Sequence, residues 1–115
     1  MNYFTLKEQA CKCCGEGELQ PDLLECLNNA REYADIPFTL SSAVRCESHN
    51  KAVGGVKNSS HVDGWAVDIE INNSMERFAI LQALIVIGFN RIGISDNFIH
   101  VDCDPNKPSC VSWTY

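Results

Sequence analysis

The sequence contains no long hydrophobic run. A helix needs about 20 consecutive apolar residues to cross a bilayer, and no such run occurs among the 115 residues, although 45% of them are hydrophobic. The amino terminus has polar residues and a charge where a signal peptide would carry its apolar segment. We therefore expect no membrane partner, and synthesis in the cytoplasm without a signal peptide.

Positive charge is scarce as well. Nine Lys and Arg residues stand against 15 Asp and Glu residues, which gives a net charge of -6 and a pI near 4.9. Phosphate binding needs a basic surface, so we expect no nucleic-acid partner. The length suits one hydrophobic core, and we expect residues 1–115 to form a single, monomeric domain.

Cysteine, in contrast, is abundant. The chain has seven, an odd number, so at least one cannot be in an intramolecular disulfide. Three are clustered and four are separated: Cys11, Cys13 and Cys14, then Cys26, Cys46, Cys103 and Cys110. Cytosolic thiols are mostly reduced. We favour packing or adventitious disulfide pairing, because no second Cys-x-x-Cys or His pair completes a structural zinc site. A second structural metal is the main alternative.

Two helices are predicted. The first begins at Pro21, a residue suited to the first helical position, and carries apolar residues at helical spacing until Tyr33. The second is strongly apolar, is capped by Asn73 with Glu76 as its capping-box partner, and runs to about Gly88.

Four strands are predicted from β-forming runs, at residues 38–44, 65–71, 91–95 and 98–103. Residues 1–20 read as a lead-in with at most one short helical turn near Thr5, and 46–63 as a long loop. The expected fold class is α+β, with a small antiparallel sheet covered by two main helices.

His61, Asp68 and His100 form the most informative pattern. The chain has only three histidines, and two imidazoles with one carboxylate are a set that holds catalytic zinc and leaves a fourth position for water. Adjacent strands lie about 4.8 Å apart, so Asp68 and His100 can converge, and Gly64 allows a turn that returns His61. His-x6-Asp is weak by itself, and three unrelated residues are the alternative.

A resemblance to a known family strengthens this interpretation. The segments that carry it are 45–50 (RCESHN), 53–55 (VGG), 59–68 (SSHVDGWAVD) and 98–102 (FIHVD). Together they resemble the zinc D-alanyl-D-alanine carboxypeptidase family, which includes VanX-type dipeptidases and the L-alanyl-D-glutamate endopeptidases of phage lysins. The likeness is greatest to its short phage-type members and extends from about Phe4 to Trp113.

The resemblance implies a fold of the hedgehog and DD-peptidase type, with zinc at the sheet face held by His61, Asp68 and His100. It also implies hydrolysis of peptide bonds in peptidoglycan. The expected site of action is then the bacterial cell wall, reached through phage lysis or as part of a virion.

Two neighbouring residues match family positions. Arg45 matches an arginine beside the substrate, where a cation clamps a carboxylate or stabilises an oxyanion; the alternative is a surface arginine paired with Glu47. Ser59 matches a serine that hydrogen-bonds substrate or orients His61, and a simple loop hydroxyl is an equal alternative.

The general base is harder to assign. Many relatives place Glu, Asp or His two or three residues before the last zinc histidine, where this chain has Phe98 and Asn97. Asp102 shares a strand face with His100, so we favour it over Asp96, which falls in the predicted turn. Orientation of a metal ligand is the alternative role for Asp102, and an Asx turn for Asp96.

Two main functions therefore compete. The first is a zinc-dependent cell-wall peptidase of the D-Ala-D-Ala carboxypeptidase or L-Ala-D-Glu endopeptidase type, with a peptidoglycan peptide as substrate. The second is a non-catalytic zinc-containing binding or structural module, such as a phage tail component, which the missing base favours. A thiol-based redox protein is a weak third, because no Cys-x-x-Cys motif lies at a helix start.

Overall fold

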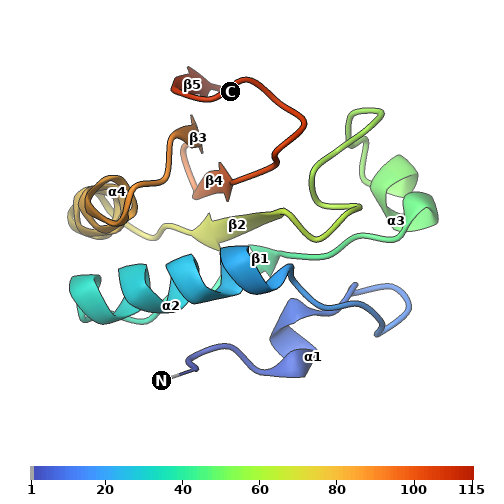
Figure 1. Cartoon of the computed structure of the whole chain (residues 1–115), viewed down its shortest axis with the longest axis horizontal. Helices are drawn as coiled ribbons and strands as arrows, with labels where there is room; N and C mark the ends of the chain where they lie inside the picture. The colour runs from blue at the N-terminus through green and yellow to red at the C-terminus, as the bar shows by residue number, and fades with distance from the viewer. Residues whose placement is uncertain (1) are drawn as a thin grey trace.

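A computed structural model describes residues 2–115 of the chain (Figure 1). Within them the chain forms four helices and five strands, in the order α1 (Leu6–Gln9), α2 (Pro21–Ala34), β1 (Leu40–Ser42), α3 (Glu47–Ala52), β2 (Ala66–Glu70), α4 (Ser74–Ile87), β3 (Arg91–Ile94), β4 (Phe98–Asp102) and β5 (Val111–Thr114). The strands form one open sheet in the order β1-β2-β4-β3-β5. The predicted α+β class is confirmed.

The sheet has one apolar and one polar face. Strands β2 and β4 pair antiparallel, with Asp68 opposite His100 and Ile69 opposite Ile99. Because side chains alternate between faces along a strand, the buried residues Ile69 and Ile99 point to one side and the metal-ligand candidates to the other. The apolar side joins the core, while the polar side is free to carry a site.

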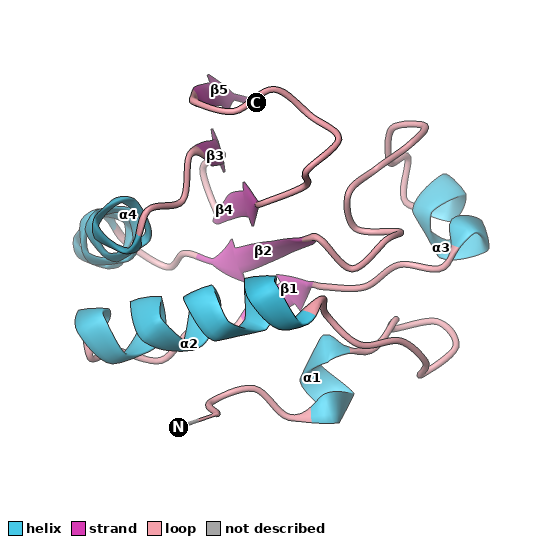
Figure 2. Cartoon of the chain, in the orientation of Figure 1, coloured by secondary structure: helices cyan, strands magenta, loops and turns pink. Residues whose placement is uncertain are grey.

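Helices α2 and α4 supply the other half of the core. They contact each other, and Figure 2 shows both lying against the sheet, with the short α3 at the opposite end of the molecule from α4. Leu23 and Leu27 of α2 and Ile80 and Leu84 of α4 are fully buried in the same cluster as the sheet residues. No helix within residues 2–115 is both long enough and apolar enough for a bilayer crossing.

The helix signals in the sequence are confirmed. Helix α2 begins at Pro21, and Asn73 caps α4 by accepting a hydrogen bond from the Glu76 backbone N–H at 2.9 Å. The other half of the predicted capping box differs: Glu76 accepts from the Asn73 side-chain amide at 3.3 Å, and not from the Asn73 backbone N–H. Helix α4 ends where Gly88 adopts the left-handed conformation, with φ +109°, which favours glycine.

Two elements depart from the sequence prediction. Helix α3 lies within residues 46–63, which were predicted to be a loop. Its polar sequence ESHNKA has no apolar periodicity that would have indicated a helix, and the Cys46 side chain caps its amino end. Strand β5 lies in the tail, where no strand was predicted. It pairs parallel with β3, unlike the other strand pairs, and this long-range pairing leaves no local pattern. The predicted strand 38–44 is shorter, as only Leu40–Ser42 pair.

Gly64 closes the turn that leads from His61 into β2, as predicted. Its φ is +78°, and a Cβ there would lie 2.9 Å from the backbone oxygen of Glu18. The Gly64 oxygen in turn accepts a hydrogen bond from the Gln20 backbone N–H at 2.9 Å. The turn is therefore packed against the segment that precedes α2.

Gly64→Ala should destabilise the protein more than Gly54→Ala. Gly54 has a similar φ of +75°, but a Cβ there meets nothing within 4 Å. Both variants incur left-handed strain of about 1–2 kcal/mol, and only Gly64→Ala adds the conflict with Glu18, which we expect to cost at least about 1 kcal/mol more. Urea denaturation measures both losses. Equal losses would show that the Glu18 backbone moves aside freely.

Candidate metal centre

His61, Asp68 and His100 come together on the polar face of the sheet. His61 lies in the turn before β2, Asp68 in β2, and His100 directly opposite Asp68 in β4. All three are buried, and one donor atom from each lies within 4.8 Å of the others. The register of two strands and one turn therefore assembles three potential ligands.

Hydrogen bonds orient both imidazoles. His61 Nδ1 lies 2.7 Å from the Ala43 carbonyl oxygen, so it donates there and Nε2 faces Asp68 Oδ1 at 3.3 Å. His100 Nε2 lies 2.7 Å from Asp102 Oδ2, and its Nδ1 lies 3.0 Å from Asp68 Oδ1. The inward-facing atoms are thus His61 Nε2, Asp68 Oδ1 and His100 Nδ1.

The electrostatics of this group favour a cation. Burial raises the pKa of Asp68, but its interactions with His100 and His61 outweigh this effect and hold the pKa well below its usual range. For His100, burial lowers the pKa, whereas hydrogen bonds to Asp102 and Asp68 raise it above its ordinary value. Two imidazoles with their outer nitrogens already engaged, together with one carboxylate, fit zinc by donor chemistry.

Asp102 is buried against His100 and is not exposed to solvent. Its side chain is 1% exposed, and Oδ1 accepts a hydrogen bond from Arg91 Nε at 2.6 Å. Burial raises its pKa, but His100 and Arg91 outweigh this effect and lower it. With both oxygens engaged, Asp102 has the contacts expected of its alternative role, orientation of His100.

Asp96 lies in the turn between β3 and β4, as predicted, and is exposed. Its backbone oxygen accepts a hydrogen bond from Arg77 of α4 at 2.8 Å. Among residues 2–115, Asp96 is not one of the side chains whose donor atoms gather with those of Asp68. Asp96 therefore does not join the group around Asp68.

A cleft of about 640 Å³ opens beside Asp68, and Arg45, His49, Glu70 and Phe98 line it with Asp68. Glu70 ends β2 and is exposed. Because it follows Asp68 by two residues, both lie on the same face of the strand. Glu70 was not predicted from the sequence, although the alternation of side chains along the predicted strand places it on the same face as Asp68.

Arg45 is held at the same cleft. Its Nε donates to Ser42 Oγ at 3.0 Å, its Nη1 to Asn50 Oδ1 at 3.2 Å, and its Nη2 to Asp68 Oδ2 at 3.5 Å. The guanidinium thus faces Asp68 and not Glu47, the alternative surface partner. Three anchored nitrogens fix a cation beside the potential ligands.

Ser59 is buried, and its hydroxyl accepts a hydrogen bond from the His61 backbone N–H at 3.2 Å. This contact belongs to the orienting role that the sequence suggested. Ser59 thus helps to shape the turn that carries His61.

Trp113 of β5 lies against His100. Its ring centroid lies 5.5 Å from that of His100, and the Arg91 guanidinium carbon lies 5.4 Å from its ring. Gly93 makes room for this ring, since a Cβ there would lie 2.4 Å from Trp113 Nε1. The parallel strand β5 thus brings an aromatic side chain against a potential metal ligand.

Comparison with known proteins identifies the family. The family model described as Peptidase M15 matches residues 2–102. The chain belongs to the peptidase M15 family. Its members are zinc-dependent peptidases, so the predicted family is confirmed at this level. No curated protein matches the chain significantly. The match ends at Asp102, so β5 and Trp113 lie outside it, although the sequence resemblance was traced to Trp113.

Asp102→Asn should weaken zinc binding by about 10- to 100-fold, because the amide cannot hold His100 as the carboxylate does. Competition with a chromophoric chelator measures the affinity. Asp96→Asn is the matched control and should bind zinc like the unmodified protein. Unchanged zinc affinity in Asp102→Asn, with activity lost, would instead favour the general-base role for Asp102.

Proposed function

We propose that residues 1–115 form a single zinc-dependent peptidase domain that hydrolyses peptide bonds in the stem peptides or cross-links of peptidoglycan, in the context of phage or prophage lysis. The observation that carries this proposal is the convergence of His61, Asp68 and His100 beside Arg45 in one cleft. Membership of the peptidase M15 family supports the reaction class.

We assign His61 Nε2, Asp68 Oδ1 and His100 Nδ1 as the zinc ligands. When bound, zinc supplies a Lewis acid that lowers the pKa of water to about 7. Around it the chain orients the ligands: the Ala43 carbonyl fixes the His61 ring and Asp102 fixes the His100 ring. Pre-set ligand orientation is worth about 10- to 100-fold in metal affinity.

Arg45 is assigned to the substrate. A guanidinium forks onto a carboxylate or stabilises the negative oxygen that develops at a peptide carbonyl under attack. Both candidate substrates offer a carboxylate, which is the carboxyl terminus of a D-Ala-D-Ala peptide or the free carboxylate of D-Glu. Ser42 and Asn50 hold two nitrogens of Arg45 in place, so little rearrangement is needed on binding.

Glu70 is our candidate for the general base in place of Asp102 and Asp96. A general base must reach the water whose proton it takes. Glu70 is exposed at the cleft on the same strand face as Asp68. Asp102 is buried with both oxygens engaged, and Asp96 is not among the residues that line the cleft.

Digestion of purified peptidoglycan tests the function. Zinc-loaded protein should release peptides that mass spectrometry identifies, and their ends show which bond is cut. His61→Ala should lose peptide release and the zinc of the His61–Asp68–His100 site, because one ligand of that site is gone. If fully loaded protein releases no peptide from any peptidoglycan type, the peptidase proposal fails and the non-catalytic module, such as a phage tail component, takes its place.

Glu70→Gln should keep its zinc while its rate of peptide release falls by about 10²- to 10⁴-fold, the usual effect of losing a general base. Asp96→Asn is again the control, an acidic residue outside the cleft, and should keep nearly full rate. The measurements are zinc content and initial rate on one soluble cell-wall peptide. A Glu70→Gln rate equal to that of Asp96→Asn would remove Glu70 from the mechanism.

A further inference from the structure

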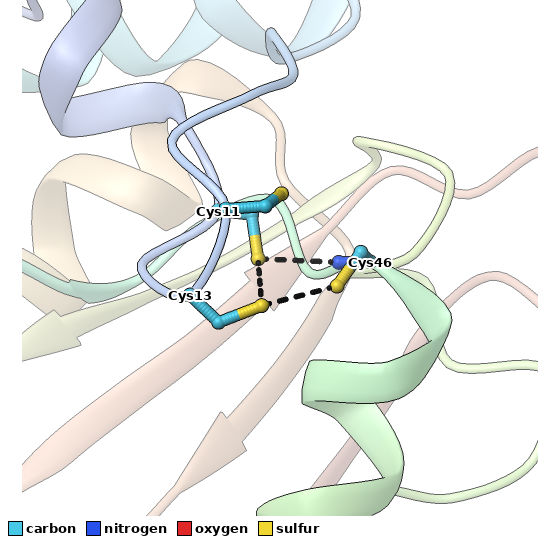
Figure 3. Close-up of side chains that lie close together, drawn as sticks. Cys11, Cys13 and Cys46 are labelled. Atoms are coloured by element: carbon cyan, nitrogen blue, oxygen red, sulfur yellow. Dashed lines mark hydrogen bonds between the residues drawn. The ribbon is translucent and has the colours of Figure 1, made fainter.

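Four cysteine sulfurs gather away from the His61 site. Cys11, Cys13 and Cys14 lie in the loop between α1 and α2, and Cys46 lies at the amino end of α3. Their sulfur atoms all lie within 4.8 Å of one another. Figure 3 shows the Cys11, Cys13 and Cys46 side chains pointing toward a common point. Among residues 2–115 every cysteine is a free thiol.

The spacing of these sulfurs suits one metal ion. A tetrahedral site with zinc–sulfur bonds of about 2.3 Å places its sulfurs about 3.8 Å apart. Here Cys13 Sγ lies 3.2 Å from Cys46 Sγ and 3.5 Å from Cys11 Sγ. Four thiols converge in this space, and thiolate sulfur is a ligand that selects soft cations.

The backbone is arranged to stabilise sulfur that carries negative charge. The Cys46 N–H donates to Cys11 Sγ at 3.4 Å, and the His49 N–H donates to Cys46 Sγ at 3.4 Å. Such donors around metal-bound ligands orient them and tune the site. The first bond joins the loop that carries Cys11 to the start of α3, and the second lies within the amino end of α3.

The loop itself has the shape of a metal-binding turn. Cys11 and Cys14 have Cys-x-x-Cys spacing, which is common among zinc ligands, and Gly15 follows with φ +73°. The Gly15 N–H donates to the Cys11 oxygen at 2.7 Å. The left-handed glycine thus reverses the chain just after the third sulfur, so all three face the same side.

We propose that Cys11, Cys13, Cys14 and Cys46 bind a structural zinc ion, distinct from the zinc assigned to His61, Asp68 and His100. Four thiolates fill the tetrahedral coordination and leave no open position, as in structural rather than catalytic zinc sites. Binding displaces the thiol protons, up to four per ion, into solvent. The product is a closed site whose role is to hold two segments together.

The segment that this ion would fix is the one that carries Arg45. Cys46 follows Arg45 directly, and the Arg45 backbone N–H donates to the His61 oxygen at 3.0 Å. On the other side, the Val44 N–H donates to the Gln9 oxygen at 3.1 Å. The zinc would therefore tie the amino-terminal loop to the strand end from which Arg45 reaches the cleft.

Metal content in a variant without the histidine site tests the proposal. His61→Ala/His100→Ala, purified under reducing conditions with zinc, should retain about one zinc ion. Adding Cys13→Ser should remove it, whereas adding Cys110→Ser, an exposed cysteine outside the cluster, should not. Zinc retained equally after both additions would overturn the proposal, as would iron in place of zinc.

Co²⁺ titration of the unmodified protein gives a second readout that does not depend on how the variants fold. Thiolate-to-cobalt charge transfer should appear in the near-ultraviolet and saturate at about one ion per chain. Cys110→Ser should leave these bands unchanged. Cobalt spectra without thiolate bands in the reduced protein would overturn the proposal, and they would leave the His61 site and its peptidase function untouched.

Discussion

The antiparallel register of β2 and β4 is the constraint on which the site depends. It sets Asp68 opposite His100 and Ala66 opposite Asp102 on one face, and it sends Ile69 and Ile99 to the other. A slip of one residue would exchange the faces, burying carboxylates in the core and exposing isoleucines. The hydrophobic packing of α2 and α4 against the apolar face therefore also secures the geometry of the polar face.

Asp68 is the centre of charge on that polar face. An ionised carboxylate is expensive to bury unless it is paired, and Asp68 meets His61, His100 and Arg45. The charge of the buried Asp102 carboxylate is paired in the same manner, with His100 and Arg91. The two carboxylates thus differ in position: Asp68 lines the cleft, whereas Asp102 is not among the residues that line it.

The junction at Arg45 and Cys46 connects the two groups of potential metal ligands. Arg45 points to Asp68, and the next residue contributes its sulfur to the cysteine cluster. Loops usually carry function but lack the rigidity of helices and strands. The proposed thiolate site at this junction would supply that rigidity through coordination, in a small protein whose α3 has little apolar surface to pack.

The sequence by itself determined the elements whose signals are local. Pro21 and Asn73 start the long helices, alternation marks β2, and the motif residues His61, Asp68 and His100 were predicted together because their pattern resembles a family. Only the tertiary structure decided the rest. Cys46 joins a cluster 32 positions away from Cys14, β5 brings Trp113 to His100, and Asp102 is enclosed by Arg91. These contacts join residues far apart in the chain, so they follow from strand register and packing, which no local pattern encodes.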